Sequence, residues 1–341
     1  MPAISVVMPV YQSAPFLRDS VGSVLAQTFR DFELILVDDG STDGSAALCD
    51  ALAGEDSRVR VLHKKNGGVS AARNDGMDLA GGEYLYFCDA DDTITPNALE
   101  KLHSVLTEAG ADTSGCGVRL VWPDGRTEDQ PGALSPGVYG ERDLRERIVV
   151  PLLGERLDQG GGVLNGFVVR FLFSRSVIDR RRLRFEGPYL EDEVFLMEYF
   201  LHARKLATMD DPLYLYLQNP GSATRRYQPG YVEVFRRVME RKGKIAEEHG
   251  LDADIPGWKD NANWAGLLIA VGNEYAAGNP KSFRERSACL KRLCGEPDMA
   301  HALANLRPKG LAGNKQLVAD LLVGRHFTLL GLLYTVKNRG R

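Results

Sequence analysis

Short apolar runs alternate with amphipathic stretches through the first half of this chain, and no other feature constrains its fold as strongly. Within residues 14–27, for example, Phe16, Leu17 and Val21 recur at helical spacing. This alternation is typical of βαβ units, in which helices cover a largely parallel sheet. The predicted strands are residues 4–8 (ended by Pro9), 32–37, 58–62 and 84–88, and the predicted helices are residues 14–27, a segment ending at Leu52, 69–79 and 96–109.

The pattern changes twice further along the chain. Residues 112–122 predict a longer strand with a return strand after the turn at 123–126, and the Gly- and Pro-rich stretch 130–162 predicts irregular structure. A strand at 167–173, a helix near 174–179 and a segment at 191–201 are predicted to complete the domain. Beyond Asn219 long helical segments begin. We therefore expect an α/β domain over residues 1–229 and a helical C-terminal region over residues 230–341.

Charge and cysteine content limit the possible partners and location of the chain. A net charge of −4 over 341 residues gives no electrostatic case for nucleic acid as a partner. Five scattered cysteines form neither a disulfide framework nor a paired metal motif, which fits a reducing compartment. The N-terminus lacks the features of a secretory signal, and no apolar run reaches the roughly 18 residues of a spanning helix. We expect a cytoplasmic protein.

Acidic groups follow two of the predicted strands directly. Asp38 and Asp39 end one strand, and Asp89-Ala90-Asp91 follows another. In open α/β sheets the loops at the carboxyl ends of the strands share one ligand-binding crevice. Hard divalent cations prefer oxygen ligands and leave positions for phosphate oxygens, so these carboxylates suit a metal–diphosphate site. Taken alone, such a triplet is equally consistent with a solvated loop or a helix cap.

Five motifs occur in order over about the first 110 residues. They are Val6-Val7-Met8-Pro9-Val10-Tyr11, Ser23-Val24-Leu25-Ala26-Gln27-Thr28-Phe29, Leu36-Val37-Asp38-Asp39-Gly40-Ser41-Thr42-Asp43, Asn66-Gly67-Gly68 with Ala72-Arg73-Asn74, and Asp89-Ala90-Asp91-Asp92. Together they resemble the signature of family 2 glycosyltransferases. The resemblance implies a GT-A (nucleotide-diphospho-sugar transferase) fold, a mixed sheet flanked by helices, with residues 1–110 as the nucleotide-binding part and 111–229 as the acceptor part.

The resemblance also implies roles for individual residues in binding a nucleotide-sugar, with a UDP-sugar as the favoured donor. Carboxylates accept hydrogen bonds from base N–H groups and ribose hydroxyls, and a guanidinium offsets phosphate charge, which agrees with these roles. The implied roles are Pro9 and Tyr11 lining the base pocket, Asp38 and Asp39 at the base, Arg73 near the nucleotide, Asp89 on the ribose side, Ala90 between the two acids as a further nucleotide-sugar-binding residue, and Asp91 as ligand of Mg2+ or Mn2+.

A second acidic group, Glu191-Asp192-Glu193, resembles the acceptor-side motif of the same family. Inversion at the anomeric carbon needs a carboxylate that takes the acceptor proton on the face opposite the leaving diphosphate. Asp192 is the predicted general base, with Glu191 as the second choice. The alternative is that these acids only favour a helix N-terminus electrostatically.

The sequence carries fewer signals for the acceptor and for the location of the protein in the cell. The Gln-x-x-Arg-Trp pattern of processive synthases is absent, which favours transfer of a single sugar. The family resemblance implies a glycan or lipid-linked acceptor, in polysaccharide or cell-surface glycan synthesis. Ser222 and residues 225–227 match a diphosphate-contacting loop loosely. Residues 327–334, followed by Lys337, Arg339 and Arg341, fit peripheral contact with the inner face of a membrane or an ordinary docking helix. A nucleotidyltransferase and a non-catalytic nucleotide-sugar or glycan-binding module remain the alternatives.

Overall fold

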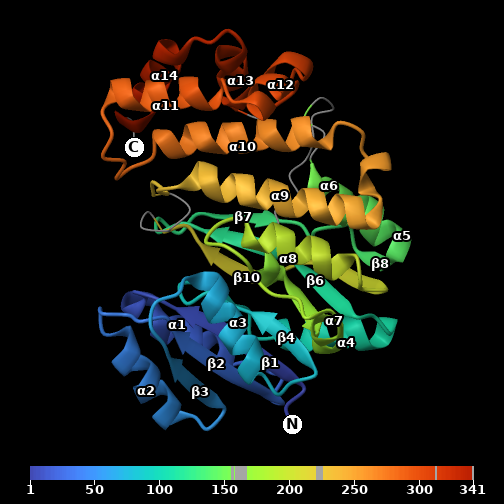
Figure 1. Ribbon diagram of the computed structural model, residues 1–341. Helices are drawn as coiled ribbons and strands as arrows, with labels where there is room; N and C mark the ends of the chain where they lie inside the picture. The colour runs from blue at the N-terminus through green and yellow to red at the C-terminus, as the bar shows by residue number, and fades with distance from the viewer. Residues whose placement is uncertain (155–156, 158–166, 220–225, 312, 340–341) are drawn as a thin grey trace. The chain divides into compact units, whose positions relative to one another are not determined.

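The computed structural model describes residues 1–154, 157, 167–219, 226–311 and 313–339 (Figure 1). Contacts divide the chain into two compact units. The first unit comprises Met1–Val149 and Asn165–Asn219, and the second comprises Val150–Leu164 and Pro220–Arg341. Ser222 and Arg225, matched loosely to a diphosphate-contacting loop, lie outside the described residues.

The first unit is built on one mixed sheet, and it confirms the predicted α/β fold class. The strands run in the order β3-β2-β1-β4-β9-β6-β10-β5, with β7 paired to β6 and β8 paired to β10. Strands β1 to β4 are parallel, and β9 runs antiparallel to both β4 and β6. The strands are β1 (Ile4–Val10), β2 (Phe32–Asp38), β3 (Val59–His63), β4 (Tyr84–Phe87), β5 (Thr93–Ile94), β6 (Thr113–Val121), β7 (Thr127–Gln130), β8 (Gly137–Gly140), β9 (Phe171–Ser174) and β10 (Lys205–Leu217).

Helices cover this sheet because the parallel strands need crossover connections. The right-handed crossover rule puts the helices that link β1, β2 and β3 on one face and the helix that returns from β3 to β4 on the other. The helices of the first unit are α1 (Ala14–Leu25), α2 (Ser45–Glu55), α3 (Val69–Leu79), α4 (Ala98–Ala109), α5 (Glu141–Leu144), a π-helical turn (Arg145–Val149), α7 (Arg175–Arg181) and α8 (Glu191–Phe200).

Helix α3 lies close to the sheet because Gly76 faces it. A Cβ atom on Gly76 would lie 2.3 Å from Cγ1 of Val7, which is fully buried in β1. We expect Gly76→Ala to lower the free energy of unfolding by about 1 to 3 kcal/mol, because overpacking displaces a stiff side chain. Urea unfolding measures the change. Gly22→Ala is the matched control: nothing lies within 4 Å of its added Cβ, so a similar loss there would contradict the steric explanation.

The prediction that Pro9 ends the first strand is wrong, since β1 continues to Val10 and Pro9 pairs in register with Val37. Strand β4 pairs with β1 only as far as Val7, whose carbonyl accepts from Cys88 N–H at 3.1 Å. In a central parallel strand, successive residues direct their backbone N–H and C=O groups to the two neighbouring strands in turn. Val7 bonds to β4, so Pro9, two residues later, also faces the β4 side. Strand β4 no longer pairs with β1 at that position, and the missing N–H of Pro9 therefore breaks no ladder bond. Proline is tolerated in a strand where no ladder bond is lost.

The prediction of irregular structure over residues 130–162 is also wrong for much of its described part. Strand β8 (Gly137–Gly140) pairs with the start of β10, and α5, the π-helical turn and α6 (Val150–Leu153) follow. The pairing partner lies more than sixty residues further along the chain, so the strand has no local signal. Strand β10 itself, unpredicted, is irregular between Thr208 and Tyr214.

The second unit is helical. Trp258 and Trp264 are buried in it, and their indole N–H groups donate to Asp252 and to the Ala302 carbonyl. No helix among its described residues, or elsewhere in the described chain, is both long and apolar enough to cross a membrane. The helices are α6 (Val150–Leu153), α9 (Tyr231–His249), α10 (Trp258–Glu274), α11 (Phe283–Leu293), α12 (Pro297–Asn305), α13 (Lys315–Val323) and α14 (Phe327–Arg339).

Candidate functional site

The carboxyl ends of β1, β2 and β4 meet at one edge of the sheet, because these strands are parallel and adjacent. Tyr11 follows β1 there with 53% of its surface exposed, and Pro9 is half-buried just before it. Asp38 ends β2, and Asp89 follows the end of β4. The residues proposed for the nucleotide therefore share one edge.

Asp39 is buried and organises a glycine loop. Its two carboxylate oxygens accept hydrogen bonds from the backbone N–H groups of Gly67 and Gly68, both at 2.8 Å. The neighbouring Asp38 accepts from the Ser41 N–H and contacts Nδ1 of His63, each at 3.0 Å. Burial opposes ionisation of Asp38, but these hydrogen bonds outweigh it and hold its pKa below the usual value. Both carboxylates thus shape the loops at this edge of the sheet.

The Asp89–Asp92 loop is fixed from both sides. The hydroxyl of Ser20 on α1 donates to the Ala90 carbonyl at 2.8 Å. On the other side, buried Asp92 accepts from the Tyr214 hydroxyl at 2.6 Å and from the Leu217 N–H at 2.7 Å. Asp92 therefore ties the loop to β10, and this long-range contact has no signal in the sequence beyond the acidic run.

Asp91 is the carboxylate of this loop that suits a divalent cation. No lysine or arginine in the described part of the chain pairs with it, whereas Asp89 is paired with Arg73. Burial, and then the charge of Asp89, raise the pKa of Asp91 to about 6, which marks a carboxylate whose charge lacks compensation. The described residues hold no group of three potential metal ligands. A hard cation at Asp91 would thus take further oxygen ligands from phosphate and water.

Arg73 joins the two acidic groups of the site. Its Nη2 lies 3.1 Å from Asp89 Oδ1, and its Nη1 lies 2.7 Å from Asp192 Oδ1 and 3.1 Å from Glu191 Oε1. The guanidinium is buried, while the side chains of Asp192 and Asp89 are 19% and 31% exposed. Burial opposes the charge of Arg73, but the carboxylates, Asp192 first, raise its pKa. The residues predicted for the nucleotide side and for the acceptor side are therefore neighbours.

Asn74, the next residue of the same motif, holds the segment that carries the second acidic group. Its side-chain amide donates to the Phe185 carbonyl and accepts from the Phe185 N–H, both at 2.9 Å. The Phe185 ring stacks on Phe195 of α8 with a centroid separation of 4.0 Å, and the guanidinium of Arg73 lies 5.2 Å from it. Asn74 received no role in the sequence analysis, although its motif was recognised.

Asp192 is positioned at the first turn of α8. The preceding Leu190 adopts a left-handed conformation with φ of 60°, which is rare for leucine and costs about 1 kcal/mol. The second oxygen of Asp192 accepts from the Val168 N–H at 3.2 Å. Burial raises the pKa of Asp192 to about 7, with Arg73 opposing and Glu191 adding to the shift. A carboxyl group of this kind can accept a proton near neutral pH.

The structure thus brings Arg73, Asp89, Glu191 and Asp192 into direct contact, with Asp91 in the same loop as Asp89. It does not bring Asp38 or Asp39 into contact with Arg73. The site offers a buried cation between carboxylates, one carboxylate suited to a metal ion and one suited to proton transfer. This combination can bind a diphosphate and deprotonate a hydroxyl group.

The sequence is similar to those of known glycosyltransferases. The family described as "Glycosyl transferase family 2" matches residues 5–179. Glycosyltransferase GlyG of Streptococcus pneumoniae is 33% identical over 259 residues, which cover 74% of this chain and 83% of that protein.

The fold is also found in solved structures. S. aureus TarS, crystallised with UDP-GlcNAc, superposes with a TM-score of 0.58 at 20% identity, covering 99% of this chain and 92% of that one. Mannosyltransferase PcManGT from Pyrobaculum calidifontis, in complex with GDP-Man and Mn2+, gives a TM-score of 0.52 at 16% identity, covering 98% and 87%. At these identities the likeness establishes the fold alone.

Proposed function

The chain belongs to glycosyltransferase family 2, and on this premise we propose that it is an inverting enzyme that moves one sugar from a UDP-sugar to a hydroxyl group of a glycan or lipid-linked acceptor. The observation that carries the proposal is the contact of Arg73 with both Asp89 and Asp192. This contact joins a donor-side residue to a candidate base. Membership of this family disfavours the nucleotidyltransferase alternative.

Asp192 is the proposed general base. Its carboxylate takes the proton of the acceptor hydroxyl as that oxygen attacks the anomeric carbon and the bond to the diphosphate breaks. Arg73 and the Val168 N–H hold the carboxylate in one orientation, so little reorganisation is needed during transfer. Glu191 is the second choice for the base, since it binds the same nitrogen of Arg73.

The donor-side residues divide the recognition of a nucleotide among them. Pro9, Tyr11, Asp38 and Asp39 are proposed to form the base pocket; Asp39 uses one acceptor position of each oxygen for the glycine loop, and a carboxylate has others. Asp89 is proposed to accept from the ribose, with Ala90 allowing close approach. PcManGT binds GDP-Man, so a guanine nucleotide is the competing donor class.

Asp91 is proposed to hold Mg2+ or Mn2+. A bound divalent cation would offset the charge that develops on the departing diphosphate. PcManGT was solved with Mn2+, which supports the use of such a cation by a protein of this fold. Among the described residues no lysine or arginine pairs with Asp91, and this local observation fits the same role.

Donor binding tests this assignment directly. We expect wild-type protein to bind a UDP-sugar more tightly with Mn2+ than without it in calorimetry, and Asp91→Asn to weaken the Mn2+-dependent binding at least about tenfold, or 1.4 kcal/mol. Asp19→Asn, on the exposed surface of α1, is the matched control. Equal Mn2+ dependence in Asp91→Asn would remove Asp91 as the ligand. No response to any UDP- or GDP-sugar would instead support a non-catalytic glycan-binding module.

The pH dependence of transfer follows from the protonation of Asp192. A general base works in its deprotonated form, so kcat/KM should rise with pH through about 7 and fall as Asp192 gains a proton below it. Because Glu191 raises the pKa of Asp192, Glu191→Gln should move the rising limb to lower pH. Glu193→Gln, in the same helical turn, should move it less. A shift to higher pH in Glu191→Gln would contradict the coupling.

We further propose peripheral contact with the cytoplasmic face of a membrane, through α14, during polysaccharide or cell-surface glycan synthesis. Leu329 and Leu332 on α14 are 53% and 51% exposed, and basic Lys337, Arg339 and Arg341 follow in the sequence. Exposed apolar side chains followed in the sequence by basic residues suit an anionic bilayer. Cosedimentation with anionic vesicles, compared with neutral ones, tests this contact.

A further inference from the structure

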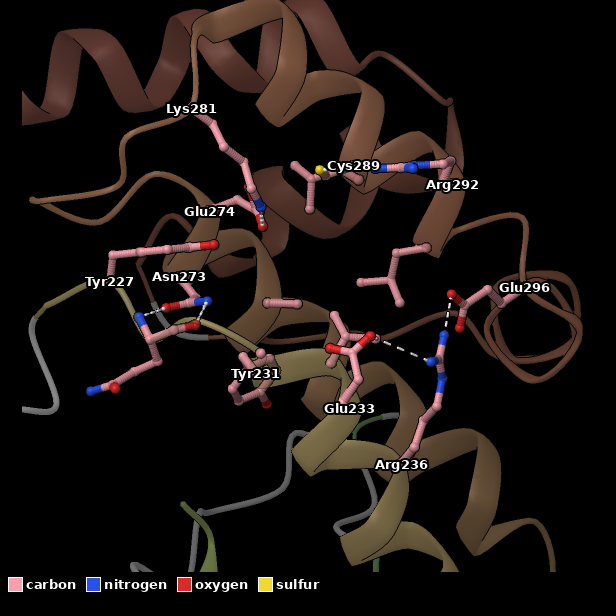
Figure 2. Close-up of a pocket in the computed structure, with 16 residues that line it drawn as sticks. Tyr227, Tyr231, Glu233, Arg236, Asn273, Glu274, Lys281, Cys289, Arg292 and Glu296 are labelled. Atoms are coloured by element: carbon pink, nitrogen blue, oxygen red, sulfur yellow. Dashed lines mark hydrogen bonds and ion pairs between the residues drawn. The ribbon is translucent and has the colours of Figure 1, made fainter. Parts of the chain in front are cut away.

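The second unit contains a cavity of about 340 Å³ lined by residues of α9, α10, α11 and the segments next to them (Figure 2). A volume of this size falls within the range of small-ligand pockets, about 300 to 1,000 Å³. The lining combines apolar side chains, such as Leu290 and Leu293, with a ring of charged and aromatic groups. None of the lining residues belongs to the proposed sugar-transfer site of the first unit.

One wall of this cavity is held rigidly. The side-chain amide of Asn273 donates to the Gln228 carbonyl at 3.0 Å and accepts from the Gln228 N–H at 2.7 Å. The adjacent Tyr227 donates its backbone N–H to the Ala277 carbonyl at 3.0 Å. These bonds fix the backbone that presents the Tyr227 ring. A wall ordered in advance lowers the entropy cost of binding a ligand.

Two ion-paired groups frame the space, and Figure 2 shows them on different sides of it. Lys281 Nζ lies 2.7 Å from Glu274 Oε1 and 5.4 Å from the centre of the Tyr227 ring. On the other side, Arg236 binds Glu296 at 2.5 Å. These pairs are partly exposed, so their remaining N–H groups and oxygen lone pairs can meet a ligand.

Two further charged groups are poorly compensated. The Arg292 guanidinium donates to the sulfur of Cys289 at 3.3 Å, a weak acceptor, and among the described residues no carboxylate lies within ion-pair distance of it. Glu233 reaches its nearest cation, Arg236, only at 3.7 Å. The cavity therefore offers a strong donor and a strong acceptor that no neighbour uses fully.

We propose that this cavity binds a neutral carbohydrate, as a second glycan-binding site of the chain. Arg292 donates to, and Glu233 accepts from, sugar hydroxyl groups, and the Tyr227 ring packs against the apolar face of a sugar ring. Glycan binding at the cavity does not depend on the proposed function. Only the identification of this glycan as the acceptor or as the growing product rests on that function.

The balance of charge selects a neutral ligand over an anionic one. Three basic residues (Arg236, Lys281 and Arg292) and three acidic residues (Glu233, Glu274 and Glu296) line the cavity. A phosphate or carboxylate bound at Arg292 would share the space with the three carboxylates, and like charges at short range repel. Hydroxyl groups both donate and accept, so a polyhydroxylated ring can use both kinds of group.

Binding of the full-length protein to an array of printed neutral and acidic glycans, without nucleotide or metal, tests the proposal. We expect binding to neutral glycans, and for the best of these an affinity that falls about tenfold in Arg292→Ala and in Glu233→Gln, the effect of one charge-assisted hydrogen bond. Arg284→Ala, exposed on the same helix but outside the lining, should bind as wild type.

Three outcomes would overturn the proposal: no binding of wild type to any neutral glycan, binding that is unchanged in both cavity variants, or binding of acidic glycans and inorganic phosphate in preference to neutral ones. Sugar transfer measured on the same preparation separates this result from the proposed function. Transfer without glycan binding at the cavity refutes the second site alone, whereas glycan binding without any donor turnover refutes the catalytic proposal alone.

Discussion

Asp192→Asn is expected to reduce kcat for sugar transfer by about 10²- to 10⁴-fold, the usual contribution of a general base. Asparagine has nearly the same shape, and its amide oxygen can still accept from Arg73 or from the Val168 N–H, which contact the native carboxylate at 2.7 and 3.2 Å. The fold and donor affinity should therefore persist. Initial rates of transfer, with UDP affinity measured by calorimetry on the same sample, give the two numbers required.

Glu191→Gln is the matched comparison for this prediction, because Glu191 binds the same nitrogen of Arg73. If Asp192 is the base, Glu191→Gln keeps most of its activity at the optimal pH and shifts the pH profile only. The reverse result, an inactive Glu191→Gln and an active Asp192→Asn, would move the role of base to Glu191. Activity in both variants would leave neither carboxylate as the base.

Arg73→Met is expected to cost about 3 kcal/mol of the free energy of unfolding at neutral pH, the low end for breaking a buried ion pair. The low end applies because the three carboxylates that bind Arg73 retain some exposure, between 13% and 31%. With the guanidinium removed, Asp89, Glu191 and Asp192 repel one another, and the pKa of Asp192 rises further because Arg73 no longer lowers it. Transfer should be lost as well, since Asp192 then holds its proton at neutral pH.

The direction in which the stability deficit of Arg73→Met changes with pH distinguishes repulsion among the carboxylates from simple loss of packing. Carboxyl groups whose pKa is raised in the folded state destabilise it once they ionise, so the deficit of Arg73→Met should grow as the pH rises from 5 to 8. Urea unfolding at several pH values measures it. Arg73→Lys restores the charge but not the two-pronged geometry, and should recover part of the stability. A deficit independent of pH would point to packing against Phe185 instead.

The periodic part of the fold was predictable because its signals are local. The bounds of α3 agree with the predicted residues 69–79, and β2 and β4 differ from their predicted bounds by one residue. Pro9 was misjudged because the register of β4 decides whether its missing N–H matters. Strands β8 and β10 depend on partners far along the chain, and β10 contains irregular pairing that interrupts its alternation.

The same distinction applies to the candidate site. The family motifs identified every residue proposed for it, because they preserve residue types in order. The links between motifs could not be read, since they join residues distant in the chain. Arg73 reaches Asp192 across 119 positions, and Tyr214 reaches Asp92 across 122. Asn74 shows the intermediate case: its motif was evident, but its partner was a backbone segment with no sequence signature.

The second unit consists of two separate stretches of the chain, and this affects both its synthesis and the design of shortened versions of the protein. Helix α6 belongs to the second unit but leaves the ribosome long before α9 and α10. The Leu152 carbonyl accepts from Lys242 Nζ, and the Leu157 N–H donates to Asn261, so this early segment waits for partners that are synthesised 90 and 104 residues later. A chain stopped near residue 230 would retain the early segment without those partners. A shortened version that contains only the first unit must therefore lack both stretches of the second unit, one of which is internal to the sequence.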